Sequence, residues 1–478
     1  MSGQSGFRHI LSVTQTGLGW LTLAALAGAT LTGGAVQPLG YTLLALGVAL
    51  IFAAQVPLDA LRGVPVATHR ALMPIALPYA AVMGWLWLQC LPGLPAAWVH
   101  AAWAFAPDPA ARAISADPSE GRLITMRLIC YGLVFLLLVR SARSGWHATM
   151  FLRAFALLSA LLAARGLVDA LSTGEPVTAS LVNRNSYATL AGFGALANLA
   201  VLRQMSGRAG TGDPAAALRR VLDGLVRGGW LPALGTLLCL SALALTASRA
   251  GLVCSLAGIL VFAAVLRPRR RQAAGMRWVL PGLILGFVML FLGSDVASRL
   301  GRLPEDARLR IYPAVLEGIA ERPWTGHGAG AFRDTFRAHV PAEMGFADWD
   351  MAHSSYLENA YEFGLPAALV FYLGLGAIGV RLLLGVRRRR ACRVIPAFAL
   401  GCFTLAALHA AVDFSLQIPA IAASFAAILG IGWAQSFPGA ATRTPTRRTA
   451  ATTAQRPVAP TSITSTSSSM RTAVSRPE

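Results

Sequence analysis

Two arginines and an asparagine stand where apolar runs of this chain begin. Arg249 follows Ser248 in a two-residue break between two apolar runs, and Arg184 and Asn185 open another run. A guanidinium is always charged and binds phosphate through paired hydrogen bonds, so these residue types suit an anionic ligand. An arginine at a membrane boundary can also extend to lipid headgroups, so Arg249 by itself leaves both interpretations open.

Arg308 and Arg310 lie in a segment that begins with proline and two acids, a pattern typical of a helix start. Apolar residues then recur at helical spacing, at Leu309, Tyr312, Leu316 and Ile319. Arg310 falls on a different face of that predicted helix. For Arg308 we prefer charge pairing on a solvated face; for Arg310 the pattern alone does not decide.

His353 and Asp413 are candidates for acid–base chemistry and for capping. His353 precedes an apolar run, and imidazole changes its charge near neutral pH, so it suits a general base; a structural histidine fits equally well. The spacing of His327 and His339 from His353 matches no common metal signature, so we predict no metal site and no cofactor. Asp413, at the end of an apolar run, could cap the following turn or pair with an arginine.

Apolar runs dominate the chain and must position these residues. Of its 478 residues, 55% are hydrophobic and 13% charged, against about 25% charged in an average soluble chain. Because a bilayer core needs roughly 20 apolar residues per helix, we predict an all-α polytopic membrane protein with about twelve transmembrane helices. The predicted spans are 15–33, 38–56, 71–91, 123–139, 150–171, 185–203, 230–247, 250–266, 278–293, 364–384, 394–412 and 419–436.

Arginine predicts how these helices are oriented, because the chain has no lysine and all 41 basic residues are arginine. With the N-terminus inside, 26 of the 41 fall on inner loops and the tail, as the positive-inside pattern requires. Both termini are therefore predicted to be cytoplasmic and the candidate residues to face outward. The charge of +20 predicts attraction to anionic membrane lipid. No aromatic-basic motif indicates a nucleic-acid partner, and the lack of lysine excludes phosphate-loop and Schiff-base chemistry.

We predict a membrane domain over residues 1–436, interrupted by a long outer loop at 294–363. This loop holds seven arginines and eleven acids, the reverse of the overall balance, and it shows helical patterning, so we expect it to be folded and functional. Residues 437–478 are rich in alanine, threonine, serine, proline and arginine. That composition predicts a disordered cytoplasmic tail.

Taken in order, these stretches resemble the O-antigen ligase and O-antigen polymerase superfamily of bacterial envelope glycosyltransferases. The matching stretches are 183–188, 248–251, 308–332 with its glycine-rich turn, 353–357 and 413–419. No one stretch is specific, but the ordered set is. The resemblance is strongest over about 180–375 and extends over a ligase-like core of about 180–430, whereas the first five spans match only as hydrophobic topology.

The resemblance implies a helical fold similar to the C-type glycosyltransferases, in a bacterial inner membrane, with a periplasmic active site. It implies transfer of a glycan from undecaprenyl diphosphate to lipid A–core or a growing polysaccharide, with inversion at the anomeric carbon and no metal. Arg249 and Arg310 would neutralise the diphosphate leaving group, and His353 would activate the acceptor hydroxyl. The resemblance implies that Arg184 assists at the lipid phosphate, and we predict Asn185, Arg308 and Asp413 as further substrate-binding residues.

Several alternatives stay open. Ligases and polymerases share the donor and the motifs, so the sequence does not separate them, nor does it identify the sugar, the acceptor or the oligomeric state. An exporter or flippase of lipid-linked sugars is the alternative from another class, although the sequence lacks the repeated halves with broken helices expected of a transporter. A structural role in envelope assembly is the third possibility.

Overall fold

The computed structural model describes residues 2–62, 66–105, 112–205, 219, 223–266, 307–340, 349–389 and 393–437. All of them belong to one structural unit, Met1–Thr442. The predicted span at 278–293 lies outside the described residues, as does the predicted tail beyond residue 437.

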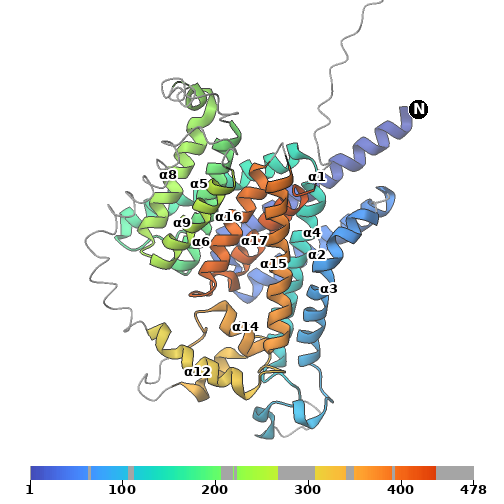
Figure 1. The fold of residues 1–478 in the computed structure, drawn as a ribbon, viewed down its shortest axis with the longest axis vertical. Helices are drawn as coiled ribbons and strands as arrows, with labels where there is room; N and C mark the ends of the chain where they lie inside the picture. Colours follow the sequence, from blue (N-terminus) through green and yellow to red (C-terminus); the bar gives the residue numbers. More distant parts are fainter. Residues whose placement is uncertain are drawn as a thin grey trace, which may run out of the picture. The chain divides into compact units, whose positions relative to one another are not determined.

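Every element within the described ranges is helical (Figure 1). The longer helices are α1 (Ser2–Leu31), α2 (Pro38–Arg62), α3 (Val66–Gln89), α4 (Pro118–Ser141), α5 (Gly145–Thr173), α6 (Arg184–Met205), α8 (Trp230–Leu245), α9 (Arg249–Val265), α12 (Ala307–Glu321), α15 (Leu365–Arg388), α16 (Val394–His409) and α17 (Pro419–Ala434). The shorter elements are η1 (Gly33–Ala35), η2 (Ala96–Trp98), η3 (Ala101–Phe105), the π-helix η5 (Leu225–Gly229), α13 (Phe332–Phe336), η7 (Arg337–His339), α14 (Ser355–Phe363) and η9 (Ser415–Gln417).

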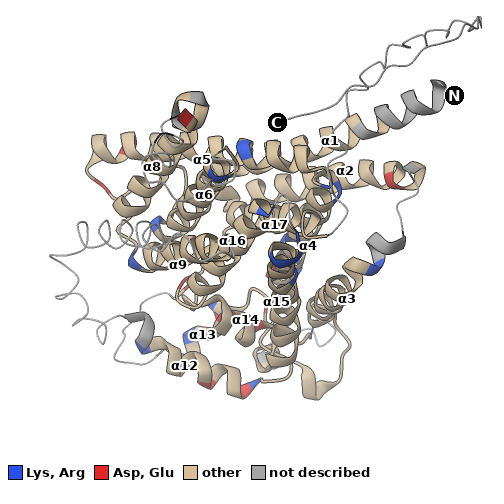
Figure 2. Cartoon of the chain, turned by 45° about the horizontal axis from the view of Figure 1, so that its top comes forward, with Lys and Arg blue, Asp and Glu red and all other residues tan. Residues whose placement is uncertain are grey.

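Five of the described helices are long and apolar enough to cross a membrane. They are Pro38–Leu61, Arg70–Gln89, Pro118–Ser141, Gly145–Thr173 and Leu365–Arg388. Four of the predicted spans form shorter apolar helices instead, of 10–17 residues: α8, α9, α16 and α17. In Figure 2 most of the helical ribbon carries no charged residue. The prediction of a helical membrane protein is therefore confirmed, whereas the number of twelve spans stays a prediction.

Small residues let the central helices pack closely. Helix α17 is buried along almost its whole length and packs against α4, α15 and α16. A Cβ at Gly432 would lie 2.3 Å from the Cβ of Ala399 on α16, and one at Gly430 would lie 2.6 Å from the Phe135 carbonyl on α4. Close approach over glycine and alanine is how helices associate where lipid removes the hydrophobic drive. Larger residues at these positions would separate the helices.

The predicted outer loop is folded wherever it is described. Helices α12, α13 and α14 enclose a small core of their own, with Ile311, Val315, Phe332, Phe336 and Tyr361 at its centre. Figure 1 shows α12 and α14 together, away from most of the longer helices. The helical patterning predicted for this loop is thus present, and its periplasmic location stays a prediction.

A network of backbone hydrogen bonds, which we call the backbone junction, ties this loop to the segment between α3 and α4. The amide of His327 donates to the Tyr361 carbonyl at 2.9 Å, and that of Gly328 donates to the Glu362 carbonyl at 3.0 Å. On the other side, the amide of Ala116 donates to the His327 carbonyl at 2.9 Å. A Cβ at Gly328 would lie only 2.1 Å from a side-chain oxygen, so glycine is needed for this close approach.

Candidate active site

His353 is held between two aromatic side chains. Its ring packs edge-on against Trp349 and Phe414, with ring centroids 6.0 and 5.2 Å away. Its backbone is left-handed, with φ of +52°, a conformation that costs an L-residue about 1–2 kcal/mol. Its carbonyl accepts a hydrogen bond from the hydroxyl of Tyr312 on α12 at 3.2 Å. A strained backbone persists where its surroundings hold it, and such positions cluster at functional sites.

The carboxylate of Glu358 accepts two hydrogen bonds, one from the residue before His353 and one from the turn that carries Phe414. One oxygen accepts from the amide of Ala352 at 2.7 Å, and the other accepts from Nε2 of Gln417 at 2.6 Å. Gln417 lies three residues beyond Phe414, and Ala352 lies three residues beyond Trp349, so Glu358 bonds to the segments that carry both aromatic neighbours of His353. Glu358 is buried, and burial together with the nearby Glu362 carboxylate raises its pKa well above the usual value.

Sequence reasoning did not assign this role to Glu358. In the sequence, Glu358 and Glu362 lie one helical turn apart, a spacing that also suits an ordinary helix interface. The available signal was position: Ser354 caps α14 by accepting from the Leu357 amide at 3.5 Å, which places Glu358 in the first turn directly after His353. An acid there can reach back to the preceding backbone.

Asn185 and Asp413 meet, although 228 residues separate them. The fully buried carboxylate of Asp413 accepts from Nδ2 of Asn185 at 2.8 Å, and its other oxygen accepts from the hydroxyl of Ser415, also at 2.8 Å. The Asp413 carbonyl accepts from the hydroxyl of Ser355, two residues after His353, at 3.2 Å. Asp413 therefore joins the start of α6, the turn after α16 and the start of α14.

Arg184 and Arg249 are the first residues of two adjacent helices, and both side chains are exposed. Ser248 caps α9 by accepting from the amide of Gly251 at 3.2 Å. A Cβ at Gly251 would lie 2.5 Å from that of Ala188, one turn into α6, so the two helix starts touch. Helix N-termini carry partial positive charge, which adds to that of the arginines.

Arg310 and Arg308 lie on α12. The Arg310 side chain is exposed, two residues before Tyr312, whose hydroxyl bonds the His353 carbonyl. The side chain of Arg308 lies outside the described residues. Hydrogen bonds thus link α12 to His353, and link the start of α14 through Asp413 to the start of α6. Arg249 begins α9, which packs against α6.

His327, in the same loop, and His100, between α3 and α4, have structural surroundings. Nδ1 of His327 lies 3.0 Å from Nε2 of His100, and its ring stacks on Tyr361 at 4.1 Å. Burial lowers the pKa of each histidine to about 4. Within the described ranges, no group of three or more histidine, cysteine or acidic residues is arranged to hold a metal ion.

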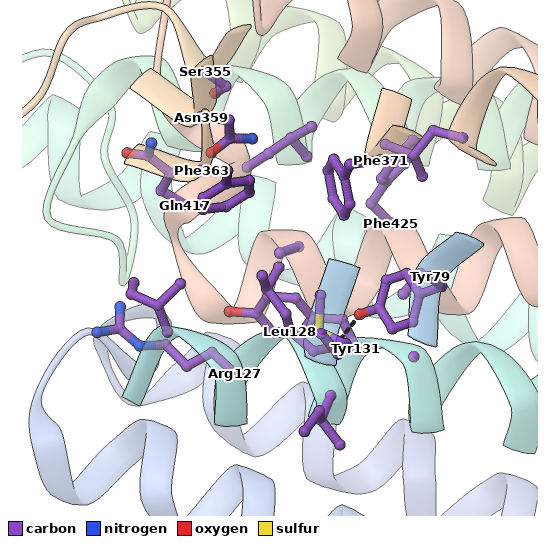
Figure 3. Close-up of a pocket in the computed structure, with 18 of the residues that line it drawn as sticks. Tyr79, Arg127, Leu128, Tyr131, Ser355, Asn359, Phe363, Phe371, Gln417 and Phe425 are labelled. Atoms are coloured by element: carbon purple, nitrogen blue, oxygen red, sulfur yellow. Dashed lines mark hydrogen bonds between the residues drawn. The ribbon is translucent and has the colours of Figure 1, made fainter. Parts of the chain in front are cut away.

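A cavity of about 1110 Å³ lies between α3, α4, α15 and α17 and reaches the start of α14 (Figure 3). Sequence reasoning did not find it. Neither His353 nor Arg184, Arg249 and Arg310 are among the described residues that line it, whereas Ser355 and Glu358 are. Helix α14 therefore carries residues that face the cavity directly after the histidine. Arg127, inside the predicted span 123–139, is the residue that could have drawn attention to it, because a charge within an apolar span is uncommon.

Residues 234–372 match the family model described as O-antigen ligase. This match confirms the resemblance to the O-antigen ligase and polymerase superfamily. The matched stretch includes Arg249, Arg310 and His353, while Asn185 and Asp413 lie outside it. The curated proteins gave no match to the chain.

Proposed function

We propose that this protein, which carries an O-antigen ligase match over residues 234–372, is a glycosyltransferase that uses a lipid-diphosphate donor. In this proposal a glycan moves from undecaprenyl diphosphate to a saccharide acceptor, either lipid A–core or a growing polysaccharide. The reaction takes place at the periplasmic face of a bacterial inner membrane. The observation that carries the proposal is the family match, because it includes Arg249, Arg310 and His353.

The proposed reaction exchanges one bond at the anomeric carbon for another. The acceptor hydroxyl attacks that carbon, the bond to the diphosphate oxygen breaks, and the diphosphate leaves with the electron pair. His353 takes the hydroxyl proton, and attack from the opposite face inverts the anomeric configuration. A histidine suits this role because its ordinary pKa lies near neutral pH.

Arginine would stabilise the negative charge that develops on the leaving group. Arg249 and Arg310 are exposed, and each guanidinium can hold phosphate oxygens through two hydrogen bonds. Two such cations can take the place of a metal, so we expect transfer to continue in a chelator. Arg184, at the start of α6, would assist at the lipid phosphate, and Arg308 would lie at the margin of the site.

Asn185 and Asp413 would act from the buried side of the site. Their side chains bond one another, and Asp413 also bonds Ser355 through its carbonyl. We assign them to positioning the start of α14, and with it His353, against the substrate. This assignment is supported by hydrogen bonds that join three separate helix ends.

The test uses purified protein in vesicles with an undecaprenyl-diphosphate glycan and candidate acceptors. We expect a new glycoside and released undecaprenyl diphosphate. Arg249→Ala and Arg310→Ala should each reduce turnover about 10²–10³-fold, the usual effect of removing one donor to a developing anion. The matched control is Arg165→Ala, an exposed arginine of α5 paired with Asp169 in the same helix, which should retain activity.

Other outcomes would contradict the proposal. Near-normal transfer by both arginine variants would remove the assigned site. Movement of the intact lipid across the vesicle without a new glycoside would indicate an exporter instead. The acceptor that is glycosylated, lipid A–core or polysaccharide, would separate a ligase from a polymerase.

A further inference from the structure

Tryptophans gather where α3 ends and α15 begins. Helix α3 carries Trp85 and the exposed Trp87 near its end. The ring of Trp98, in η2, packs edge-on against that of Trp85, with ring centroids 6.4 Å apart, and remains 41% exposed. Trp324, in the turn after α12, is 75% exposed. Because tryptophan is mostly buried in proteins that are surrounded by water, these exposed rings indicate a binding surface.

Hydrogen bonds fix the level of Trp324 along α3 and α15. The carbonyl of Pro323 accepts from the amide of Leu365, the first residue of α15, at 2.8 Å. The carbonyl of Thr325 accepts from Nε2 of Gln89, the last residue of α3, at 2.7 Å. The two helices pack against each other (Figure 1). Trp324 therefore lies beside both helix ends at once.

The ends of these two helices mark the edge of the membrane. Both α3 and α15 are long and apolar enough to cross it. Because a spanning helix ends where hydrocarbon gives way to headgroups, Gln89 and Leu365 lie at the membrane–water interface. Tryptophan is enriched there, since its ring is apolar and its indole N–H can reach headgroups or water. Trp98 lies at the same level, because its ring contacts Trp85, four residues before Gln89.

The charged side chains beside Trp324 are bonded within the protein. Arg322 donates to the carbonyls of Trp98 and Gly326, at 2.6 and 2.9 Å. The carboxylate of Glu321 lies 3.0 Å from Nε2 of His339. Since the Arg322 guanidinium is held by backbone carbonyls, it favours no phosphate of one particular lipid. This arrangement suits binding to the interface itself, whatever the charge of the headgroups.

We infer that Trp98 and Trp324 form a membrane anchor, which we call the tryptophan anchor, with both rings in the headgroup region of the bilayer. The anchor borders the backbone junction, because Trp324 lies two residues before Gly326 and Arg322 ties the Trp98 segment to the same turn. Contact with lipid thus holds both sides of the junction at one height over the bilayer. The inference does not rest on the proposed function, since it uses only the spanning helices and their ends.

Photolabelling tests the depth of the anchor. The full chain is placed in phosphatidylcholine nanodiscs with a phosphatidylcholine whose diazirine lies either near the glycerol or at the end of the acyl chain. Mass spectrometry of peptides then locates the adducts. We expect the shallow probe to label Trp98 and Trp324 about fivefold more than the deep probe does. The reference is Leu373, exposed in the middle part of α15, which the deep probe should label more strongly.

A second lipid composition tests whether headgroup charge matters. Half of the phosphatidylcholine is replaced by phosphatidylglycerol, with the shallow probe unchanged. Labelling of Trp324 should stay within about twofold, because the neighbouring Arg322 is held by the carbonyls of Trp98 and Gly326 rather than by lipid phosphate.

Hydrogen exchange tests whether the anchor steadies the junction. In nanodiscs, Trp324→Ser should speed exchange of the His327 and Gly328 amides about tenfold, because the exposed ring is held by lipid rather than by the protein core. Trp324→Tyr keeps an amphipathic ring and should exchange like wild type. The matched control is Trp146→Ser, since Trp146 is 64% exposed at the start of α5 and should leave the exchange of both amides unchanged.

Four results would overturn the inference. If neither probe labels Trp98 and Trp324, the surface faces water; if both probes label them equally, the rings lie in the hydrocarbon. Labelling that requires phosphatidylglycerol would indicate a site for an anionic headgroup instead. Unchanged exchange in Trp324→Ser would remove the anchoring role. Glycan transfer is measured separately, so failure of the proposed function would leave each of these readings intact.

Discussion

Removing the Glu358 carboxylate should release His353 without disturbing the arginines. Glu358 accepts two buried hydrogen bonds, from the Ala352 amide at 2.7 Å and from Gln417 at 2.6 Å. Removing this acceptor leaves the buried Ala352 amide without its partner, which costs about 1–3 kcal/mol. The left-handed backbone of His353 stores about 1–2 kcal/mol that favours relaxation once the Ala352 bond is lost. Loss of that bond alone therefore corresponds to roughly a 10- to 100-fold fall in the population with His353 in place.

The variants to compare are Glu358→Ala and Glu358→Gln. We expect kcat to fall about 10- to 100-fold in the alanine variant, following that population. The glutamine variant should lie in between, because its amide oxygen can accept only one of the two hydrogen bonds. The KM for the lipid-diphosphate donor should hardly change, since Arg249 and Arg310 are untouched. Steady-state kinetics in vesicles measures both constants, and thermal unfolding shows whether each variant is folded.

Glu362→Gln is the matched control. Glu362 lies one turn further along α14, is equally buried and accepts from the Phe332 amide at 3.2 Å, but it makes no hydrogen bond to the residues flanking His353. Its kcat should stay within about threefold of wild type. The reasoning fails if folded Glu358→Ala keeps its kcat, or if Glu362→Gln loses as much as Glu358→Ala.

Three further outcomes are expected. Gly251→Leu should lower the thermal midpoint measured by fluorescence-detected gel filtration, because its side chain must displace Ala188; overpacking costs about 1–3 kcal/mol, and an unchanged midpoint would contradict the packing. Asp413→Ala should unfold at lower temperature than Asp413→Asn, because alanine leaves both Nδ2 of Asn185 and the Ser415 hydroxyl without this acceptor. The pKa of His100 is lowered to about 4, so His100 stays neutral in the folded protein at pH values where it is protonated in the unfolded chain. The free energy of unfolding should therefore decrease as the pH falls from 6.5 to 4. His100→Phe should lose less stability over that pH range in thermal unfolding, and an equal loss would remove His100 as a cause.

The sequence predicted the positions of the helices far better than their lengths and packing partners. Apolar runs predicted α2 to α5 and α15 because a spanning helix needs a long apolar stretch whatever it packs against. The runs that became α8, α9, α16 and α17 are even more apolar but form shorter helices, whose ends are set by local features such as Ser248 and Pro419. The small residues of α17 allow close packing but do not identify its partners.

The candidate site was predictable only in part for a similar reason. The ends of apolar runs carry three of the predicted residues, Asn185, His353 and Asp413. Polar residues are expected at such ends, and the structure brings these ends together. The cavity depends on which faces of α3, α4, α15 and α17 turn toward one another, and no periodicity in a single run contains that information. Glu358 could be assigned only after the partners of both its oxygens were known.

The backbone junction has a consequence for the order of assembly during synthesis. It joins Ala116 to His327, and His327 and Gly328 to Tyr361 and Glu362, so segments made early and late meet in one place. The Ala116 amide must wait for more than two hundred further residues before the His327 carbonyl exists. Until Glu362 has left the ribosome, the helices from α1 to α9 can form and His327 can bond Ala116, but Gly328 lacks the Glu362 carbonyl. The segment that carries His353 is therefore fastened late, and a chain cut before Glu362 would keep its early helices while lacking the hydrogen bond from Gly328 to Glu362.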